Sequence, residues 1–129
     1  MNYADLNKIK LHYEDTGPRD GKTLLFANSH GTDLRLWDPI IPYLPKSLRL
    51  IRFDKRGHGL SECPVPPYSM DSLIEDVASL VDHLKVQSYV FVGLSIGGMI
   101  TQGLAVKRPN QVKAMVLSNT GTKIGNPSI

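Results

Sequence analysis

The sequence predicts an α/β fold: a mostly parallel sheet with helices on both faces and an antiparallel edge. Predicted strands alternate with predicted helices from residue 23 onward, which is the order that builds parallel sheets. Most of these strands are continuous apolar runs, as expected of strands that are covered on both faces. Residues 9–13 instead alternate between apolar and polar side chains, which indicates a half-buried antiparallel strand near the edge.

The strands are predicted from short apolar runs that end in glycine, proline or polar turns. They are expected at residues 3–6, 9–13, 23–27, 48–53, 89–92 and 114–117.

Three helical segments separate the later strands. Residues 36–44 have helical spacing, but Pro39 and Pro42 restrict them to a short or irregular helix. Residues 69–84 form the clearest helix, with Ser69 or Asp71 as its N-cap. A third helical pattern runs from Ser95 to residue 108, and residues 54–67 form a long loop rich in glycine and proline.

Composition narrows the class of protein. A chain of 129 residues is expected to form one domain, and its net charge of +3 comes from scattered basic residues, so no nucleic-acid surface is predicted. No apolar run is long enough to span a bilayer, and residues 1–5 lack the start of a secretory signal. The single cysteine, Cys63, cannot form an internal disulfide and is assigned no chemistry. A cytoplasmic protein is therefore expected.

Residues 93–98 (GLSIGG) carry the clearest chemical signal. They lie between a predicted buried strand and a predicted helix, the context of a nucleophile elbow, in which a tight turn exposes a serine hydroxyl. Ser95 is the expected nucleophile, and the Ile96 N–H is the expected first oxyanion donor at the helix N-terminus. The alternative is that Ser95 is an ordinary N-cap; the glycines at 97 and 98 count against it, because a simple cap needs no close backbone approach.

The loop after the 23–27 strand (residues 28–32, NSHGT) is expected at the same carboxyl end of the sheet as Ser95. Its Thr32 N–H is the expected second oxyanion donor, with the alternative that His30 and Gly31 only shape a turn. His30 itself is expected to be structural, and His58 to be a base only if nothing better exists.

Three other features are interpreted as structural or left open. The glycines and charged residues of 54–61 (DKRGHGLS) suit a rigid loop held by hydrogen bonds. His12 and His83 are expected to be solvated, and Trp37 either to lie in the core or to form a pocket wall.

These segments together resemble the α/β-hydrolase superfamily and, within it, the 3-oxoadipate enol-lactonases. The matching segments are residues 28–38, 54–61, 93–98 and 117–125, so the likeness covers nearly the whole chain. His30 departs from the lactonase pattern, in which leucine is expected, and follows related esterases and C–C bond hydrolases.

The resemblance implies that Ser95 attacks a lactone carbonyl while the Ile96 and Thr32 amides hold the oxyanion. Water then releases 3-oxoadipate, and no metal or organic cofactor is implied. Arg35 or Lys123 can steer the substrate carboxylate, or can simply be solvated. Trp37 is the remaining candidate for contact with the substrate.

In this family the triad acid and base follow the nucleophile, on loops after later strands. No residue of this chain matches them by position, so residues 1–129 are interpreted as a partial hydrolase core without its cap helices and C-terminal strands. The isolated chain is expected to have negligible lactonase activity, because a serine hydroxyl needs a neighbouring base. Strand 114–117 would then be an open apolar edge that self-associates, aggregates or pairs with a separately supplied second half.

Two alternatives remain open from the sequence. One is a different carboxylic-ester or C–C bond hydrolase on the same scaffold, acting on another small molecule. The other is a non-catalytic interaction module or half of a split enzyme, which the DNA sequence beyond the codon for Ile129 would distinguish from a truncation.

Overall fold

The computed structural model describes residues 2–121 of the chain. Its elements are β1 (Asn2–Leu6), β2 (Ile9–Thr16), β3 (Thr23–Ala27), the 3₁₀ helices η1 (Leu34–Trp37) and η2 (Ile41–Tyr43), β4 (Arg49–Phe53), α1 (Met70–His83), β5 (Tyr89–Leu94), α2 (Ile96–Lys107) and β6 (Val112–Ser118). Every element expected from the sequence is present, and most boundaries agree within three residues.

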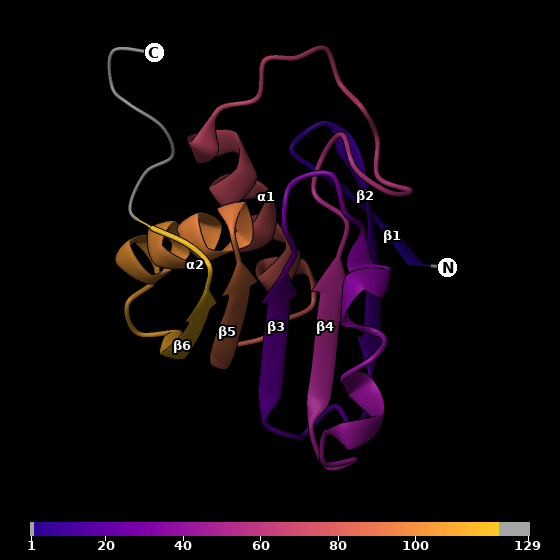
Figure 1. Cartoon of the computed structure of the whole chain (residues 1–129), viewed down its shortest axis with the longest axis vertical. Helices are drawn as coiled ribbons and strands as arrows, with labels where there is room; N and C mark the ends of the chain where they lie inside the picture. Colours follow the sequence, from indigo (N-terminus) through magenta and orange to yellow (C-terminus); the bar gives the residue numbers. More distant parts are fainter. Residues whose placement is uncertain (1, 122–129) are drawn as a thin grey trace.

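The six strands form one sheet in the order β1-β2-β4-β3-β5-β6 (Figure 1). Strands β4, β3, β5 and β6 are parallel, whereas β1 and β2 join antiparallel at one edge. Strand β3 is central, since Leu24 lies opposite Leu50 of β4 and Val90 of β5. The carboxyl ends of β3, β4 and β5 therefore meet at one end of the sheet, and the 54–69 loop extends beyond that end (Figure 1).

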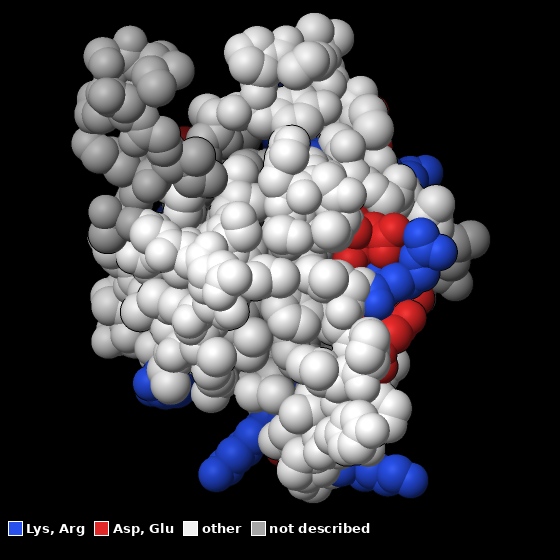
Figure 2. All heavy atoms as spheres, viewed as in Figure 1, with Lys and Arg blue, Asp and Glu red and all other residues white. Residues whose placement is uncertain are grey.

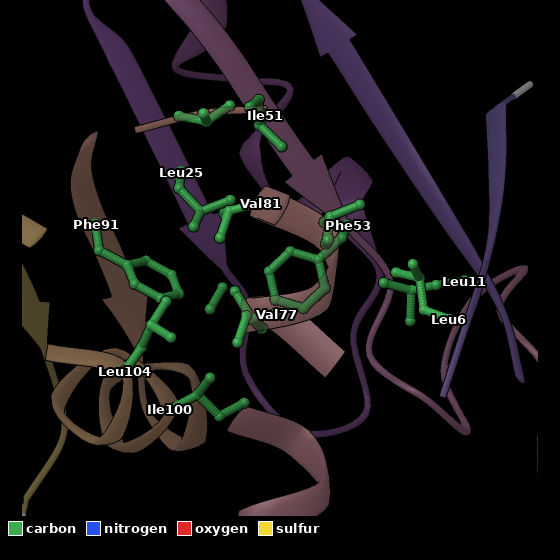
Figure 3. Packing of buried hydrophobic residues seen from close by; sticks show 14 of the residues in the cluster. Leu6, Leu11, Leu25, Ile51, Phe53, Val77, Val81, Phe91, Ile100 and Leu104 are labelled. Atoms are coloured by element: carbon green, nitrogen blue, oxygen red, sulfur yellow. The ribbon is translucent and has the colours of Figure 1, made fainter. Parts of the chain in front are cut away.

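Both α-helices pack on the same face of the sheet. Figure 3 shows strand side chains such as Leu25, Phe53 and Phe91 meeting Val77 of α1 and Ile100 of α2. These side chains are almost fully buried, so this layer supplies most of the apolar burial that stabilises the fold.

A smaller cluster covers the opposite face. Phe26 and Leu50 pack there with Trp37 of η1, and the Phe26 and Trp37 ring centroids lie 5.0 Å apart. The sequence predicts helices on both faces of the sheet. The structure has two α-helices on one face and two 3₁₀ helices on the other. Pro42 stands in the first turn of η2, in keeping with the short, irregular helices predicted around the prolines.

Ser69 caps the N-terminus of α1, which is one of the two caps expected from the sequence. Ser69 has extended backbone angles, and its hydroxyl accepts a hydrogen bond from the Ser72 amide at 3.1 Å.

Strand β6 forms the other edge of the sheet, next to β5 (Figure 1). Its side chains are largely exposed, and Val116 keeps 53% of its surface accessible. In the part of the chain that the structure describes, no helix combines the length and apolarity needed to cross a membrane.

Candidate active site

Ser95 is the single residue between the end of β5 and the start of α2. Its backbone angles are φ 57° and ψ −121°, a left-handed conformation that is costly for a residue with a side chain. Its hydroxyl makes no capping hydrogen bond to α2. The geometry is therefore that of a strained elbow and not of an ordinary serine N-cap.

Three glycines allow the elbow to form. A methyl group on Gly93 would lie closer than 3.0 Å to the Thr101 hydroxyl, and one on Gly97 would collide with the Ala27 carbonyl. A methyl group on Gly98 would meet Thr120 equally closely. The backbone of α2 thus begins directly against β3 and the segment after β6, which only glycine permits.

The segment that follows β6 supports the elbow from the other side. The Ser95 amide donates to the Ser118 carbonyl at 2.9 Å, and the Thr120 hydroxyl donates to the Ser95 carbonyl at 2.6 Å. The Gln102 amide group adds a bond to the Gly121 carbonyl at 3.0 Å. Sequence reasoning missed these roles; the only available signal was that residues 117–125 resemble the lactonase pattern.

The loop after β3 is held by its own side chains. The Asn28 side-chain amide donates to the Thr32 carbonyl at 2.7 Å, and the Thr32 hydroxyl donates to the Ser29 carbonyl at 2.8 Å. The Thr32 amide reaches the same Ser29 carbonyl only at 3.4 Å, a long and weak bond. The Ile96 amide has no acceptor within residues 2–121. Within the described residues, the Ile96 amide is therefore without an internal acceptor, and the Thr32 amide has only this one long bond.

A cavity of about 650 Å³ lies at this end of the sheet, and Thr32 and Ile96 both belong to its lining, whereas Ser95 does not. Its lining comes from the 30–33 loop, the 55–59 loop, the start of α1 and the start of α2. The lining residues are His30, Gly31, Thr32, Asp33, Lys55, Arg56, Gly57, His58, Gly59, Pro66, Tyr68, Leu73 and Ile96.

Two histidines of the cavity lie edge to face. The His30 and His58 ring centroids are 5.2 Å apart, and His58 Nδ1 donates to the Arg56 carbonyl at 3.2 Å. Burial lowers the pKa of His58, so its ring is neutral at physiological pH, with Nε2 as the acceptor. No carboxylate among residues 2–121 bonds either ring, so neither forms the histidine–carboxylate pair of a triad.

The loop after β4 is rigid, as expected. Asp54 accepts bonds from the Leu34 amide at 2.7 Å and the Leu60 amide at 2.9 Å. Arg56 forms a bidentate pair with Asp76 of α1, at 2.6 and 2.7 Å. The burial and pairing fix this loop beside the cavity.

The expectation that His12 is solvated is wrong. His12 is only 4% exposed, and its Nδ1 lies 2.7 Å from Asp54 Oδ2. The buried Asp54 carboxylate takes the ring as a further hydrogen-bond partner beside the Leu34 and Leu60 amides, because buried carboxylate oxygens need donors. His83, by contrast, lies on the exposed surface of α1 as predicted.

The residues considered for substrate contact lie elsewhere. Arg35 is exposed and paired with Asp33 at 2.8 Å, and Trp37 lies in the cluster with Phe26. Neither belongs to the lining of the 650 Å³ cavity. On the face in Figure 2, the acidic side chains gather in one group together with basic ones, and further basic side chains lie separately along the lower part of the molecule. Arg52 pairs with Asp38 at 2.6 Å. Lys123 lies outside the described residues.

No cluster of three or more histidine, cysteine, aspartate or glutamate side chains in residues 2–121 could hold a metal ion. Cys63 is a free, exposed thiol.

The elbow, the cavity lined by Thr32 and Ile96, and the strand order define a class of protein. The chain belongs to the alpha/beta hydrolase fold family, whose model matches residues 22–128.

Within that family the chain is similar to enol-lactonases. It is 40% identical over 117 residues to 3-oxoadipate enol-lactonase 2 of Acinetobacter baylyi, covering 91% of this chain and 44% of the relative. The crystal structure of the enol-lactonase from Burkholderia xenovorans superposes with a TM-score of 0.92 at 39% identity, over 99% of this chain and 50% of that one. A bifunctional esterase/perhydrolase of Acinetobacter calcoaceticus is 33% identical, over 85% of this chain and 41% of the relative. The chain thus spans about half the length of these relatives and matches their N-terminal half.

Proposed function

We propose that the whole protein is a serine hydrolase that opens an enol-lactone to 3-oxoadipate, with Ser95 as its nucleophile. The observation that carries this proposal is the left-handed backbone of Ser95 between β5 and α2, directly before Ile96, which lines a cavity together with Thr32. A strained serine is retained where its exposure is useful. The similarity to two enol-lactonases supports the substrate class.

In the proposed reaction, Ser95 Oγ attacks the lactone carbonyl carbon, a base supplied by the rest of the whole protein takes the hydroxyl proton, and the carbonyl oxygen becomes an oxyanion. The Ile96 and Thr32 amides stabilise that charge, because both are fixed before reaction and neither has a strong internal acceptor. The ring C–O bond then breaks and releases an enolate, which is a better leaving group than a simple alkoxide. The enolate takes up a proton on carbon and becomes a ketone, and water hydrolyses the acyl-enzyme, which restores the Ser95 hydroxyl and releases 3-oxoadipate.

We further propose that residues 1–129 are a partial hydrolase core that lacks the proton acceptor. Neither His30 nor His58 has a carboxylate partner in the described residues, so neither replaces the triad histidine. Loss of a triad member lowers the rate constant on the order of a millionfold. The isolated chain is therefore expected to be almost inactive.

The test is a turnover assay in two forms of the protein. The chain is assayed alone and after extension with the C-terminal part of 3-oxoadipate enol-lactonase 2, with the enol-lactone as substrate. Turnover only in the extended form, lost in Ser95→Ala, supports the proposal. Turnover by the chain alone, or turnover that survives Ser95→Ala, contradicts it.

A second candidate is an esterase or C–C bond hydrolase on the same core. His30 favours it, because this residue lines the cavity and departs from the lactonase pattern. The relative described as an esterase/perhydrolase also supports ester chemistry on this scaffold. Faster turnover of a simple aryl ester than of the enol-lactone by the extended protein would favour this candidate.

We propose that the C-terminal half of the same fold pairs with the free edge of β6. The exposed apolar side chains of Met115, Val116 and Leu117 and the unpaired backbone of an edge strand support this pairing. The exposed, free thiol of Cys63 supports a reducing compartment, which we propose to be the cytoplasm.

A further inference from the structure

We infer that Lys55 is a positioning residue: its ammonium group occupies the carbonyls of the 28–32 loop and so leaves the Thr32 amide free to bind an oxyanion. This inference rests on the proposed function, because it assigns a residue to the same site. Nothing in the sequence pattern singles out Lys55 for this role.

The contacts of Lys55 are those of a buried cation. Lys55 follows β4 and is only 2% exposed, although its Nζ carries a charge. Nζ donates to the Asn28 carbonyl at 3.1 Å and to the Ser29 carbonyl at 2.8 Å. A buried ammonium group needs such partners, and here both partners belong to the loop that carries Thr32. Lys55 therefore ties the loop after β4 to the loop after β3.

Three donors compete for the Ser29 carbonyl oxygen: Lys55 Nζ, the Thr32 hydroxyl and the Thr32 amide. A carbonyl oxygen accepts two strong hydrogen bonds. Lys55 Nζ and the Thr32 hydroxyl both reach it at 2.8 Å. The Thr32 amide is left at 3.4 Å from the same oxygen, which is too long for a strong bond. Without the lysine, this amide would move toward the vacated lone pair and away from the cavity.

The charge of Lys55 is balanced by few neighbours. Asp54 is the adjacent carboxylate, and it is already bonded to His12. The remaining charged or titratable residues that line the cavity are His30, Asp33, Arg56, His58 and Tyr68. Burial lowers the pKa of Lys55 from 10.5 to about 8, and the attraction of Asp54 opposes that shift. The bond to Ser29 is consequently strongest below pH 8, where the amine is charged.

Backbone NMR on the chain of residues 1–129 tests this inference without any turnover. The Thr32 amide nitrogen shift is recorded by carbon-detected NMR, which needs no amide proton, from pH 6 to 10 in the wild type, Lys55→Met, Lys55→Arg and the exposed-lysine control Lys46→Met. We expect a titration of the Thr32 amide with a midpoint near pH 8 in the wild type and in the control. Lys55→Arg should keep the low-pH shift throughout the range, since its guanidinium stays charged. In Lys55→Met, the Thr32 amide nitrogen should be shifted downfield at all pH values, because this amide then forms a stronger hydrogen bond to the Ser29 carbonyl.

Two results overturn the inference. One is a Thr32 amide that does not change in a folded Lys55→Met variant, and the other is a titration near pH 8 that persists in that variant. If Lys55→Met fails to fold, the wild type and Lys55→Arg still test the inference. A Thr32 shift that stays constant with pH in the wild type would contradict it. A Thr32 shift that titrates near pH 8 in Lys55→Arg would contradict it as well. Failure of the proposed hydrolase function leaves these amide measurements unchanged, so the two failures are distinguishable.

Discussion

The Thr120 hydroxyl donates a 2.6 Å hydrogen bond to the carbonyl oxygen of Ser95. The Ser95 amide is bound from the same side by the Ser118 carbonyl, so both backbone polar groups of the strained residue have partners after β6. The left-handed conformation of Ser95 is thus maintained by a segment more than twenty residues away in the chain. This bond links the stability of the elbow directly to its proposed chemistry.

Thr120→Val should destabilise the elbow with little change of shape. The valine keeps the side-chain volume but removes the hydroxyl donor, so we expect a loss of about 1 kcal/mol in the free energy of unfolding. Urea unfolding measures the change, with Thr16→Val as the control, because Thr16 is exposed on β2. Equal losses in the two variants would show that the Thr120 bond does not support the elbow.

Gly97→Ala should be far more costly than Gly31→Ala. The added methyl group at 97 would meet the Ala27 carbonyl, whereas nothing lies within 4 Å of one at 31. We expect a loss of about 3 kcal/mol or more at 97 from overpacking. At 31 we expect about 1 kcal/mol, the cost of a positive φ for a residue with a side chain. Denaturant unfolding of both variants checks the order, and the reverse order would contradict the packing described for α2.

The stability of the chain should rise with pH through the titration of Lys55. The pKa of Lys55 falls from 10.5 in the unfolded chain to about 8 in the fold, so between these values the unfolded state binds the extra proton. Stability therefore increases from pH 8 to 10.5, by up to about 3 kcal/mol. The measurement is the difference in unfolding free energy between wild type and Lys55→Met at several pH values. A constant difference would contradict the assigned burial of the charge.

The free edge of β6 should promote association of the chain. Val116→Lys places a charge on this strand, where Val116 is 53% exposed, and should reduce association because a charged edge resists strand pairing. Val106→Lys is the matched control on α2, where Val106 is 84% exposed. Sedimentation velocity measures the association of the wild type, Val116→Lys and Val106→Lys. Association that Val106→Lys reduces as strongly as Val116→Lys would assign the contact to another surface.

The sequence predicts the strands and helices well because their patterns are local. The apolar run of β3 and the serine cap of α1 need no knowledge of the rest of the chain. The elbow at Ser95 is also local, since its glycines and its serine fall within six residues. Fold class, strand boundaries and the proposed nucleophile were therefore accessible from the sequence.

Contacts between distant segments were not accessible in this way. His12 alternates with apolar neighbours and looks like a solvent-facing residue, yet Asp54, far along the chain, draws it into the interior. The support of Ser95 by Thr120 and the contact of Lys55 with the 28–29 carbonyls depend on which loops the sheet order brings together. Such pairings have no periodic signal, so sequence patterns do not reveal them.

The most direct test of the account is covalent labelling of Ser95 by an aryl phosphonate, followed by intact-protein and peptide mass spectrometry. A reactive nucleophile at an elbow should be labelled at Ser95 alone in the protein extended with the C-terminal part of a relative. Labelling of residues 1–129 alone should be at least about a thousandfold slower, because the proton acceptor is missing. Label on a different residue, or equal rates in the two forms, would contradict the account.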